Sequence, residues 1–335
     1  MPEALGLNFV DHGENRLNTT IRLLALALSL ALGSAAAAQP NLPSGMPPPP
    51  ANAPPPKAVA LGPYAVTVER DPSLPTHTIY RPTDLSAFAG GKLPIVAWGN
   101  GGCANVGLMF RDFLTEIASH GFLVVAVGPI DAPMPNFGPP PAGAPMSIPP
   151  PATHDSQLID AIDWAIAQNG KAGSYRGVLD TTAVAVMGQS CGGLQAIAVG
   201  GDPRIKTVVI WNSGVFNTAS GTPAGMPALS GATKASLAKI HVPMAYFIGG
   251  PTDIAFANAE DDFKRIQGIP VFKGDLNVGH GGTYNQPNGG WFGEVGAAWL
   301  KWRLKGDQQA GKLFDGPRCG LCVDPAWTVE KKGMN

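Results

Sequence analysis

The stretch Ala-Val-Ala-Val-Met-Gly-Gln-Ser-Cys-Gly-Gly, residues 183–193, joins a run of small and branched apolar residues to a serine framed by glycines. The apolar part, 183–187, predicts a short strand buried on both faces, and residues 194–199 are compatible with a helix. Gly-x-Ser-x-Gly between a strand and a helix is the pattern of a nucleophile elbow, in which the glycines leave room for a strained serine. We therefore expect Ser190 to present its hydroxyl above a sheet edge near a helix N-terminus. The alternative is a glycine-rich turn in which the serine is incidental.

Similar strand patterns recur on both sides of this stretch. Short, almost continuous apolar runs cover 94–98, 122–127, 207–211 and 243–248. Apolar residues at helical spacing occur at 110–117, 158–166 and 291–302. Residues 64–69 and 77–80 alternate in polarity, which is typical of antiparallel edge strands. Strands that alternate with helices predict an α/β fold with a mostly parallel central sheet and helices on both faces.

The composition limits the classes of partner. The chain has 335 residues, 44% of them hydrophobic, which is enough to form a sizeable core. Charged residues make up only 14% and the formal net charge is −1. This balance gives no electrostatic reason to expect a nucleic acid or an anionic membrane as a partner. We expect a monomer that acts on a small-molecule or polymeric substrate.

The N-terminus has the pattern of a secretory signal peptide. Arg16 and Arg22 precede an apolar run at 23–32, and small residues follow at 33–38. A basic start, a short apolar run and an Ala-x-Ala ending are typical of such a peptide, and we expect cleavage after Ala38. The run is too short to span a bilayer, which needs about twenty residues, although an uncleaved anchor is the alternative. The protein is therefore expected to be secreted or periplasmic, without stable membrane insertion after cleavage.

The rest of the chain divides by composition. Residues 39–57 are rich in proline and predict an extended linker that cannot pack into a core. We expect a single catalytic domain at 58–312 and a C-terminal tail at 313–335. Two insertions, at 129–151 and 214–232, are rich in small residues and too short to form a large cap domain.

A serine at its ordinary pKa is a weak nucleophile and needs a neighbouring base. In chains with a nucleophile elbow, the order along the sequence is Ser, then Asp or Glu, then His. His241 and His280 are the histidines that follow Ser190. His241 precedes a predicted strand and so lies at the wrong end of the sheet. His280 lies in the glycine-rich stretch 278–282 before the last predicted helix, and we expect it to be the base.

The base in turn needs a carboxylate that orients its ring and stabilises the imidazolium. Asp253 is the first carboxylate after the predicted strand at 243–248, so it is the expected acid. Asp275, close to His280 in sequence, is the weaker rival. Glu260, Asp261 and Asp262 are expected on the solvated face of the following helix.

The oxyanion of an acyl-transfer intermediate needs preorganised N–H donors. One is expected from Cys191, the residue after the nucleophile, and the second from the glycine-rich loop 99–103. Within that loop, Gly102 and Cys103 both remain candidates. The alternative is a plain turn between a strand and a helix.

The four cysteines are expected to form two disulfides. Cys103 and Cys191 lie in the two segments that should converge on the oxyanion hole, and a bond between them would fix the distance between the donors. Two buried free thiols are the alternative. Cys319 and Cys322 form a Cys-x-x-Cys motif that follows the last predicted helix, where a local staple fits better than a redox or metal site.

These motifs carry a family resemblance. The chain from about Gly62 to Leu304 resembles secreted bacterial and fungal α/β-hydrolases of the dienelactone-hydrolase and polyester-hydrolase-like group, in the stretches 188–192, 99–103 and 279–281 and in Asp253. The resemblance implies an α/β-hydrolase fold without a large cap domain and a triad of Ser190, Asp253 and His280. The chain departs from many dienelactone hydrolases in having serine as the nucleophile, and from many lipases in having Asn100 where a histidine often precedes the glycines.

The expected reaction is hydrolysis of a carboxylic ester through an acyl-enzyme, with neither a metal nor an organic cofactor. An amidase or peptidase on the same triad, a non-catalytic binding protein of this fold and a thiol-disulfide protein are the alternatives. Substrate choice is expected from the two insertions and from residues 284–291. The aromatic residues expected to bind substrate are Trp98, Trp211, Tyr284 and Trp291. Core packing is the alternative role for the three tryptophans.

Overall fold

The computed structural model describes residues 48–135 and 150–334. The predicted signal peptide, the first part of the predicted linker and most of the insertion at 129–151 lie outside these residues. None of the helices in the described ranges combines the length and apolar character that crossing a membrane requires.

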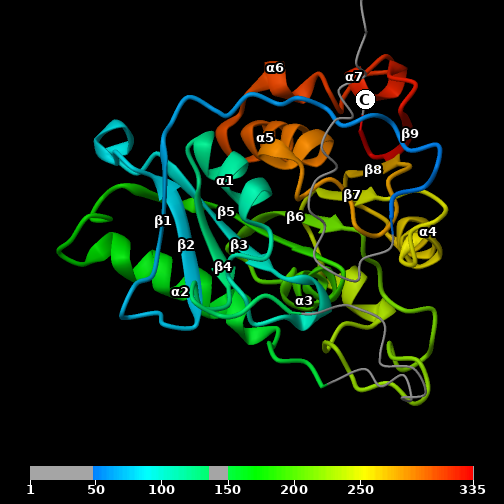
Figure 1. Ribbon diagram of the computed structural model, residues 1–335, viewed down its shortest axis with the longest axis horizontal. Helices are drawn as coiled ribbons and strands as arrows, with labels where there is room; N and C mark the ends of the chain where they lie inside the picture. Colours follow the sequence, from blue (N-terminus) through cyan, green and yellow to red (C-terminus); the bar gives the residue numbers. More distant parts are fainter. Residues whose placement is uncertain (1–47, 136–149, 335) are drawn as a thin grey trace, which may run out of the picture. The chain divides into compact units, whose positions relative to one another are not determined.

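The described residues form one nine-stranded sheet in the order β1-β2-β4-β3-β5-β6-β7-β8-β9 (Figure 1). The strands are β1 Val66–Glu69, β2 His77–Pro82, β3 Leu93–Gly99, β4 Leu123–Val127, β5 Leu179–Gln189, β6 Ile205–Trp211, β7 Met244–Ile248, β8 Val271–Leu276 and β9 Trp327–Lys332. Strands β3 to β8 run parallel, whereas β1, β2 and β9 are joined antiparallel at the two sides. The predicted α/β class and mostly parallel sheet are therefore confirmed.

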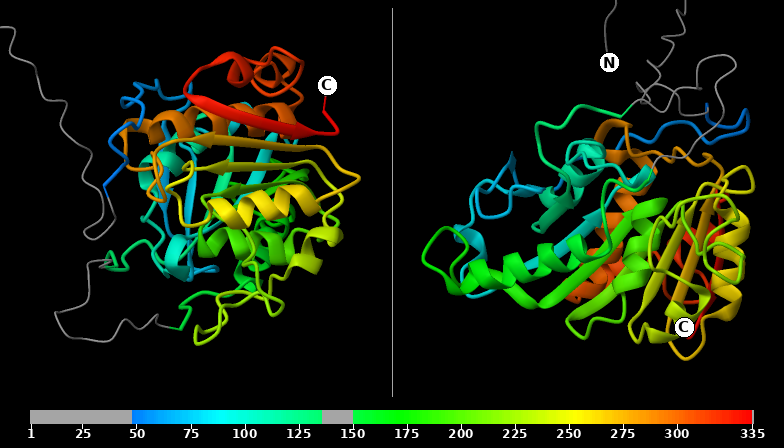
Figure 2. Two further views of the ribbon diagram at one scale, coloured as in Figure 1. Left: turned by 90° about the vertical axis from the view of Figure 1, so that its right-hand side faces the viewer. Right: turned by 90° about the horizontal axis from the view of Figure 1, so that it is seen from below.

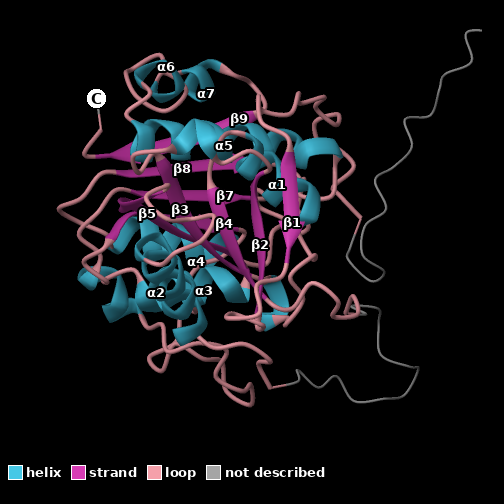
Figure 3. Cartoon of the chain, turned by 90° about the vertical axis from the view of Figure 1, so that its left-hand side faces the viewer, coloured by secondary structure: helices cyan, strands magenta, loops and turns pink. Residues whose placement is uncertain are grey.

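Helices cover both faces of this sheet. The α-helices are α1 Arg111–Ser119, α2 Ser156–Gly170, α3 Cys191–Val199, α4 Phe256–Arg265, α5 Gly290–Lys305, α6 Gln308–Gly311 and α7 Gly320–Val323. In Figure 3, α1 and α5 lie on one side of the sheet, and α2, α3 and α4 lie on the other. Because side chains alternate along a strand, neighbouring residues of β3 enter different cores: Ala97 packs with α2 and α3, and Trp98 packs with α1 and α5.

Strand β5 lies inside the parallel part of the sheet, between β3 and β6. Both faces of its second half are buried, which explains why residues 183–187 read as a continuous apolar run. Since neighbouring strands are parallel, their carboxyl ends meet at one edge of the sheet, and ligands of open α/β sheets bind at that edge. The loops after β3, β5, β6, β7 and β8 are therefore the ones that can meet there.

Two segments have more structure than their sequences predict. Residues 327–332, assigned to the tail, form β9 and pair with β8 along the edge of the sheet, as Figure 2 shows. Residues 50–59, mostly assigned to the linker, lie against the region before and at the start of α5. Asn52 and Asn277 are joined by a side-chain hydrogen bond of 2.7 Å, and Trp291 Nε1 donates to the carbonyl of Pro55 at 3.0 Å. This segment, 50–59, is called the strap below.

Candidate active site

Ser190 occupies the sharp turn between β5 and α3, with φ of 53° and ψ of −115°. Its N–H donates to the carbonyl of Trp211 at the end of β6, at 2.9 Å. A Cβ on Gly188 would lie 2.2 Å from the backbone of Gly192, and one on Gly192 would lie 2.0 Å from the carbonyl oxygen of Gly99. A side chain at 188 would clash within the turn, and one at 192 would prevent the close approach of the turn to β3, so the glycines of the motif are a steric requirement.

Three distant side chains meet at this turn. His280, in the loop between β8 and α5, lies with Nε2 3.0 Å from Oγ of Ser190. Its Nδ1 lies 2.6 Å from Oδ1 of Asp253, in the loop after β7. A carboxylate can only accept, so Nδ1–H donates to Asp253 and the neutral ring leaves Nε2 free to accept the serine proton. The three residues predicted from the sequence are thus brought together by the carboxyl ends of β5, β7 and β8.

The surroundings of Asp253 favour its ionised form. Burial opposes ionisation, but the hydrogen bond and electrostatic attraction of His280 and the N–H groups of Ala255 and Gly249 outweigh it. The pKa of the Asp253 carboxyl therefore lies below its ordinary value. An ionised carboxylate next to the ring is what a histidine base needs to keep its tautomer and to be stabilised once protonated.

The rival residues are engaged elsewhere. Asp275 accepts a hydrogen bond from Lys273 at 3.1 Å, and burial raises its pKa. His241 is exposed and lies before β7, at the opposite end of that strand from Asp253. The expectation of a solvated face at 260–262 is wrong for Asp262, which is fully buried and accepts from the N–H of Val215 at 2.8 Å.

The loop after β3 has the geometry expected of an oxyanion-hole segment. Gly102 and Cys103 adopt φ of 60° and 50°, which turns the backbone sharply at the end of the strand. The carbonyl of Asn100 accepts from the N–H of Gly192 at 3.0 Å, so the loop is tied to the first turn of α3. Cys191 is the first residue of α3, where N–H groups have no partner within the helix.

The predicted disulfide between Cys103 and Cys191 is present. It joins the loop after β3 to the start of α3, and the carbonyl oxygen of Leu229 lies 3.4 Å from the sulfur of Cys103. The insertion at 214–232 therefore passes over the disulfide. The second predicted bond, Cys319–Cys322, is also present, at α7 in the C-terminal segment.

The expected substrate-binding aromatic residues are mostly core residues, which corrects that prediction. Trp98, Trp211 and Tyr284 are fully buried, so they cannot contact a substrate without rearrangement. All three pack against Phe113 between the sheet and α1, Trp211 and Tyr284 edge-to-face and Trp98 at a tilt. Trp291 is only partly buried, but its indole N–H is bonded to the strap.

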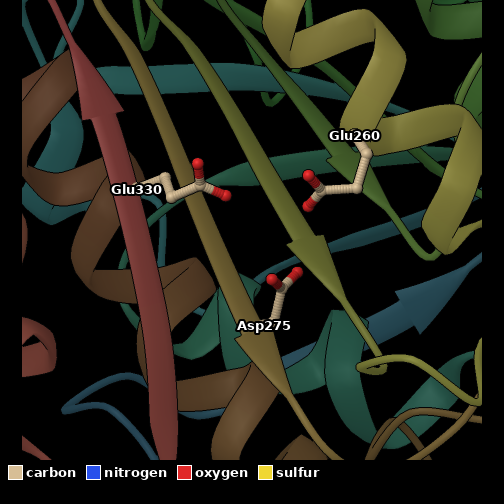
Figure 4. Close-up of side chains that lie close together, drawn as sticks. All are labelled: Glu260, Asp275 and Glu330. Carbon is tan, nitrogen blue, oxygen red and sulfur yellow. The ribbon is translucent and has the colours of Figure 1, made fainter.

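Three acidic side chains lie close enough together to hold a metal ion. Glu260, Asp275 and Glu330 point toward a common centre in Figure 4. The ammonium group of Lys273 lies within that centre, 3.1 Å from Asp275 and 2.6 Å from Glu330, and also pairs with Glu260. The positive charge that these carboxylates require is thus supplied by a lysine, and the cluster joins α4, β8 and β9.

Three asparagines near the site were not predicted to matter. Asn212 contacts Asp253, Asn100 fixes the loop after β3, and Asn52 belongs to the strap. A position directly after a parallel strand was the only available signal for the first two.

No protein-family model matches the chain, and no curated protein matches it significantly. The contacts among Ser190, His280 and Asp253 are therefore the basis for assigning a function.

Proposed function

We propose that this protein is a secreted serine hydrolase of the α/β-hydrolase type that cleaves carboxylic esters. The observation that carries the proposal is the continuous set of contacts from Oγ of Ser190 through His280 to Asp253, at 3.0 and 2.6 Å. Its position at a strand–helix turn, beside a second glycine-rich loop, supports the role of nucleophile for Ser190. The signal-peptide pattern and two disulfides support secretion, because disulfides persist in oxidising compartments.

The mechanism follows from the three side chains. His280 accepts the proton of Ser190 as the serine oxygen attacks the ester carbonyl, and the N–H of Cys191 together with that of Gly102 or Cys103 stabilises the oxyanion. The protonated ring then donates to the alcohol, which leaves an acyl-enzyme on Ser190. Water, activated by the same ring, releases the acid. Asp253 keeps the ring in the required tautomer throughout.

The test is turnover of p-nitrophenyl acetate and butyrate by the secreted protein and by Ser190→Ala. We expect kcat to fall on the order of 10⁴-fold in the variant, because the oxyanion donors alone retain only residual catalysis. Ser220→Ala, which changes an exposed serine of the insertion at 214–232, is the matched control and should behave like the parent protein. Unchanged turnover in Ser190→Ala would overturn the assignment of the nucleophile.

A series of acyl chain lengths, with amide and peptide substrates beside the esters, would define the reaction. Ester turnover without amide turnover supports the proposed class. A serine-directed phosphonate should label the parent protein at Ser190 and leave Ser190→Ala unlabelled. An unlabelled parent protein that turns over none of these substrates would favour a non-catalytic role.

A further inference from the structure

Strained backbone gathers at this site. Four non-glycine residues of the described chain have positive φ, and three of them are Cys103, Ser190 and Asn212. Non-glycine residues adopt this conformation rarely, and it is concentrated at functional sites. The first two belong to the proposed oxyanion hole and nucleophile. Asn212, with φ of 42°, has no role in the proposed reaction.

The side chain of Asn212 connects the acid to the loop of the base. It is fully buried, and its Nδ2 donates to Oδ2 of Asp253 at 2.7 Å and to the carbonyl of Gly279 at 3.1 Å. Gly279 directly precedes His280. One amide group therefore holds both the carboxylate and the backbone that carries the imidazole.

The bonds to Asp253 leave its carboxylate little freedom to rotate. Oδ1 accepts from His280 and from the N–H of Ala255 at 2.9 Å. Oδ2 accepts from Asn212 and from the N–H of Gly249 at 2.9 Å. Asn212 is the only side chain other than His280 among these four donors, and so it is the one that mutation can remove.

Tyr284 fixes which way the Asn212 amide points. Its hydroxyl donates to Oδ1 of Asn212. A flipped amide would place Oδ1 against Asp253 and the Gly279 carbonyl, which are both acceptors. Burial and the charge of Asp253 raise the pKa of Tyr284 well above its ordinary value, so its hydroxyl keeps the proton it donates.

The backbone around Asn212 also contacts the nucleophile. Ser190 donates its N–H to Trp211, and the hydroxyl of Ser213 donates to the carbonyl of Ser190 at 2.6 Å. Asn212 itself donates its N–H to the carbonyl of Phe247, at 2.8 Å. Residues 211–213 thus bridge the turn that carries Ser190 and the strand that leads to Asp253.

We infer that Asn212 is a positioning residue that orients Asp253 toward His280, and that Tyr284 fixes the orientation of the Asn212 amide. The inference rests on the proposed function, because it assigns these residues a part in the same Ser–His–Asp reaction. It extends the proposed triad by two buried side chains: Tyr284 donates to Asn212, and Asn212 donates to Asp253.

The decisive variant is Asn212→Asp, which keeps the shape but makes donation depend on a proton. The introduced carboxyl must be protonated to donate to Asp253, and two carboxyls that share a site cannot both ionise easily. We therefore expect kcat to keep much of its parent value at low pH and to fall as pH rises and the proton is lost. The parent protein should lack this alkaline decline. Asn217→Asp, an exposed asparagine on the following loop, is the matched control and should keep the parent profile.

Two further variants separate positioning from folding. Asn212→Ala should lower kcat at least about 10-fold with little change in KM, because the loss affects proton transfer rather than binding. Tyr284→Phe should lower kcat less, because the Asn212 amide keeps both of its acceptors. Circular dichroism and thermal melting identify folded variants, and Tyr284→Phe supplies the kinetic test if the Asn212 variants do not fold.

A second readout needs no turnover. The Nδ1 proton between His280 and Asp253 should give a far-downfield proton NMR signal, because bonds to a carboxylate are short. This signal should move or broaden in Asn212→Ala and stay unchanged in Asn217→Asp. If the parent protein hydrolyses no ester but the signal responds to Asn212, the proposed function fails and the positioning inference stands. If ester turnover, its pH profile and the signal are all insensitive to Asn212, the inference is overturned.

Discussion

Removal of the Cys103–Cys191 disulfide should strongly destabilise the fold. The bond joins residues separated by 88 positions. A cross-link restricts the unfolded chain, and the loop-entropy relation gives a contribution of roughly 4.6 kcal/mol at 25 °C for a loop of this length. The Cys319–Cys322 bond has a separation of only 3, for which the same relation gives about 1.6 kcal/mol. Replacing both cysteines of each pair by alanine therefore supplies a test and its matched control.

The measurement is urea unfolding followed by tryptophan fluorescence and circular dichroism. We expect Cys103→Ala/Cys191→Ala to lose about three times as much free energy of unfolding as Cys319→Ala/Cys322→Ala. If the first variant is destabilised no more than the second, the cross-link does not constrain the unfolded chain as argued.

Removal of the Cys103–Cys191 disulfide should reduce activity less than stability, because hydrogen bonds still hold the loop after β3. The amide of Asn100 donates to the carbonyls of Val106 and Val127 at 2.9 and 2.6 Å, and the N–H of Gly192 still bonds to Asn100. We expect kcat toward p-nitrophenyl butyrate to fall roughly 10-fold at a nearly unchanged KM, because the N–H donors act on the transition state. A large rise in KM with unchanged kcat would mean that the disulfide shapes substrate binding instead.

Three further changes test other parts of the structure. Burial raises the pKa of Asp262 from 3.8 to about 6, so the folded state binds this proton more tightly than the unfolded state. Its contribution to stability is fully present only below the unfolded pKa and is lost as pH rises through 6. The free energy of urea unfolding of the parent protein should therefore fall by roughly 2 kcal/mol relative to Asp262→Asn between pH 4 and 7, and equal pH dependence of the two proteins would contradict this. Deletion of residues 48–59, which removes the whole strap, should lower kcat roughly 10-fold, since Pro50 lies beside Gly279 and small displacements of His280 are costly. Unchanged ester kinetics would show that the strap is dispensable. Lys273→Met should lower the free energy of unfolding by about 3–5 kcal/mol in the same urea assay, because it leaves Asp275 and Glu260 facing each other without a cation; a stability equal to that of the parent would refute this.

The site was predictable because it depends on order along the sequence. Ser190, Asp253 and His280 each follow a recognisable apolar strand or precede a recognisable helix, and parallel strands bring their carboxyl ends together. The disulfide followed from the same reasoning, since Cys103 and Cys191 lie in two loops that must converge. These predictions needed only local sequence patterns and no knowledge of the contacts between the loops.

Strands β8 and β9 were not predicted because charged residues interrupt their patterns. Lys273 and Asp275 lie in β8 with both side chains buried, where an apolar run would be expected. Glu330 of β9 forms an ion pair with Lys273 of β8, so each strand supplies the opposite charge that the other requires. Neither segment, considered alone, shows that β8 and β9 pair.

The prediction that aromatic residues bind substrate was wrong for a related reason. An aromatic side chain at the carboxyl end of a strand can face a substrate or the core, and the sequence does not say which. Trp98 and Trp211 lie at or near the carboxyl ends of β3 and β6, the two strands that flank β5, on the face that α1 and α5 cover. Their burial depends on helices distant in sequence, which the local pattern of β3 or β6 does not contain.

Asn100 and Asn212 occupy equivalent places in the sheet, which only the order of the strands reveals. β3 and β6 flank β5, and each is followed immediately by a buried asparagine, Asn100 and Asn212. The amide of Asn100 holds the loop of the proposed oxyanion donor, and the amide of Asn212 holds the proposed acid, Asp253. Asparagine suits both places because one short side chain carries both donors and an acceptor. At position 212 it also tolerates a positive φ. The turn of Ser190 is therefore braced from both neighbouring strands, so damage to either asparagine should reduce turnover without removing any group that reacts.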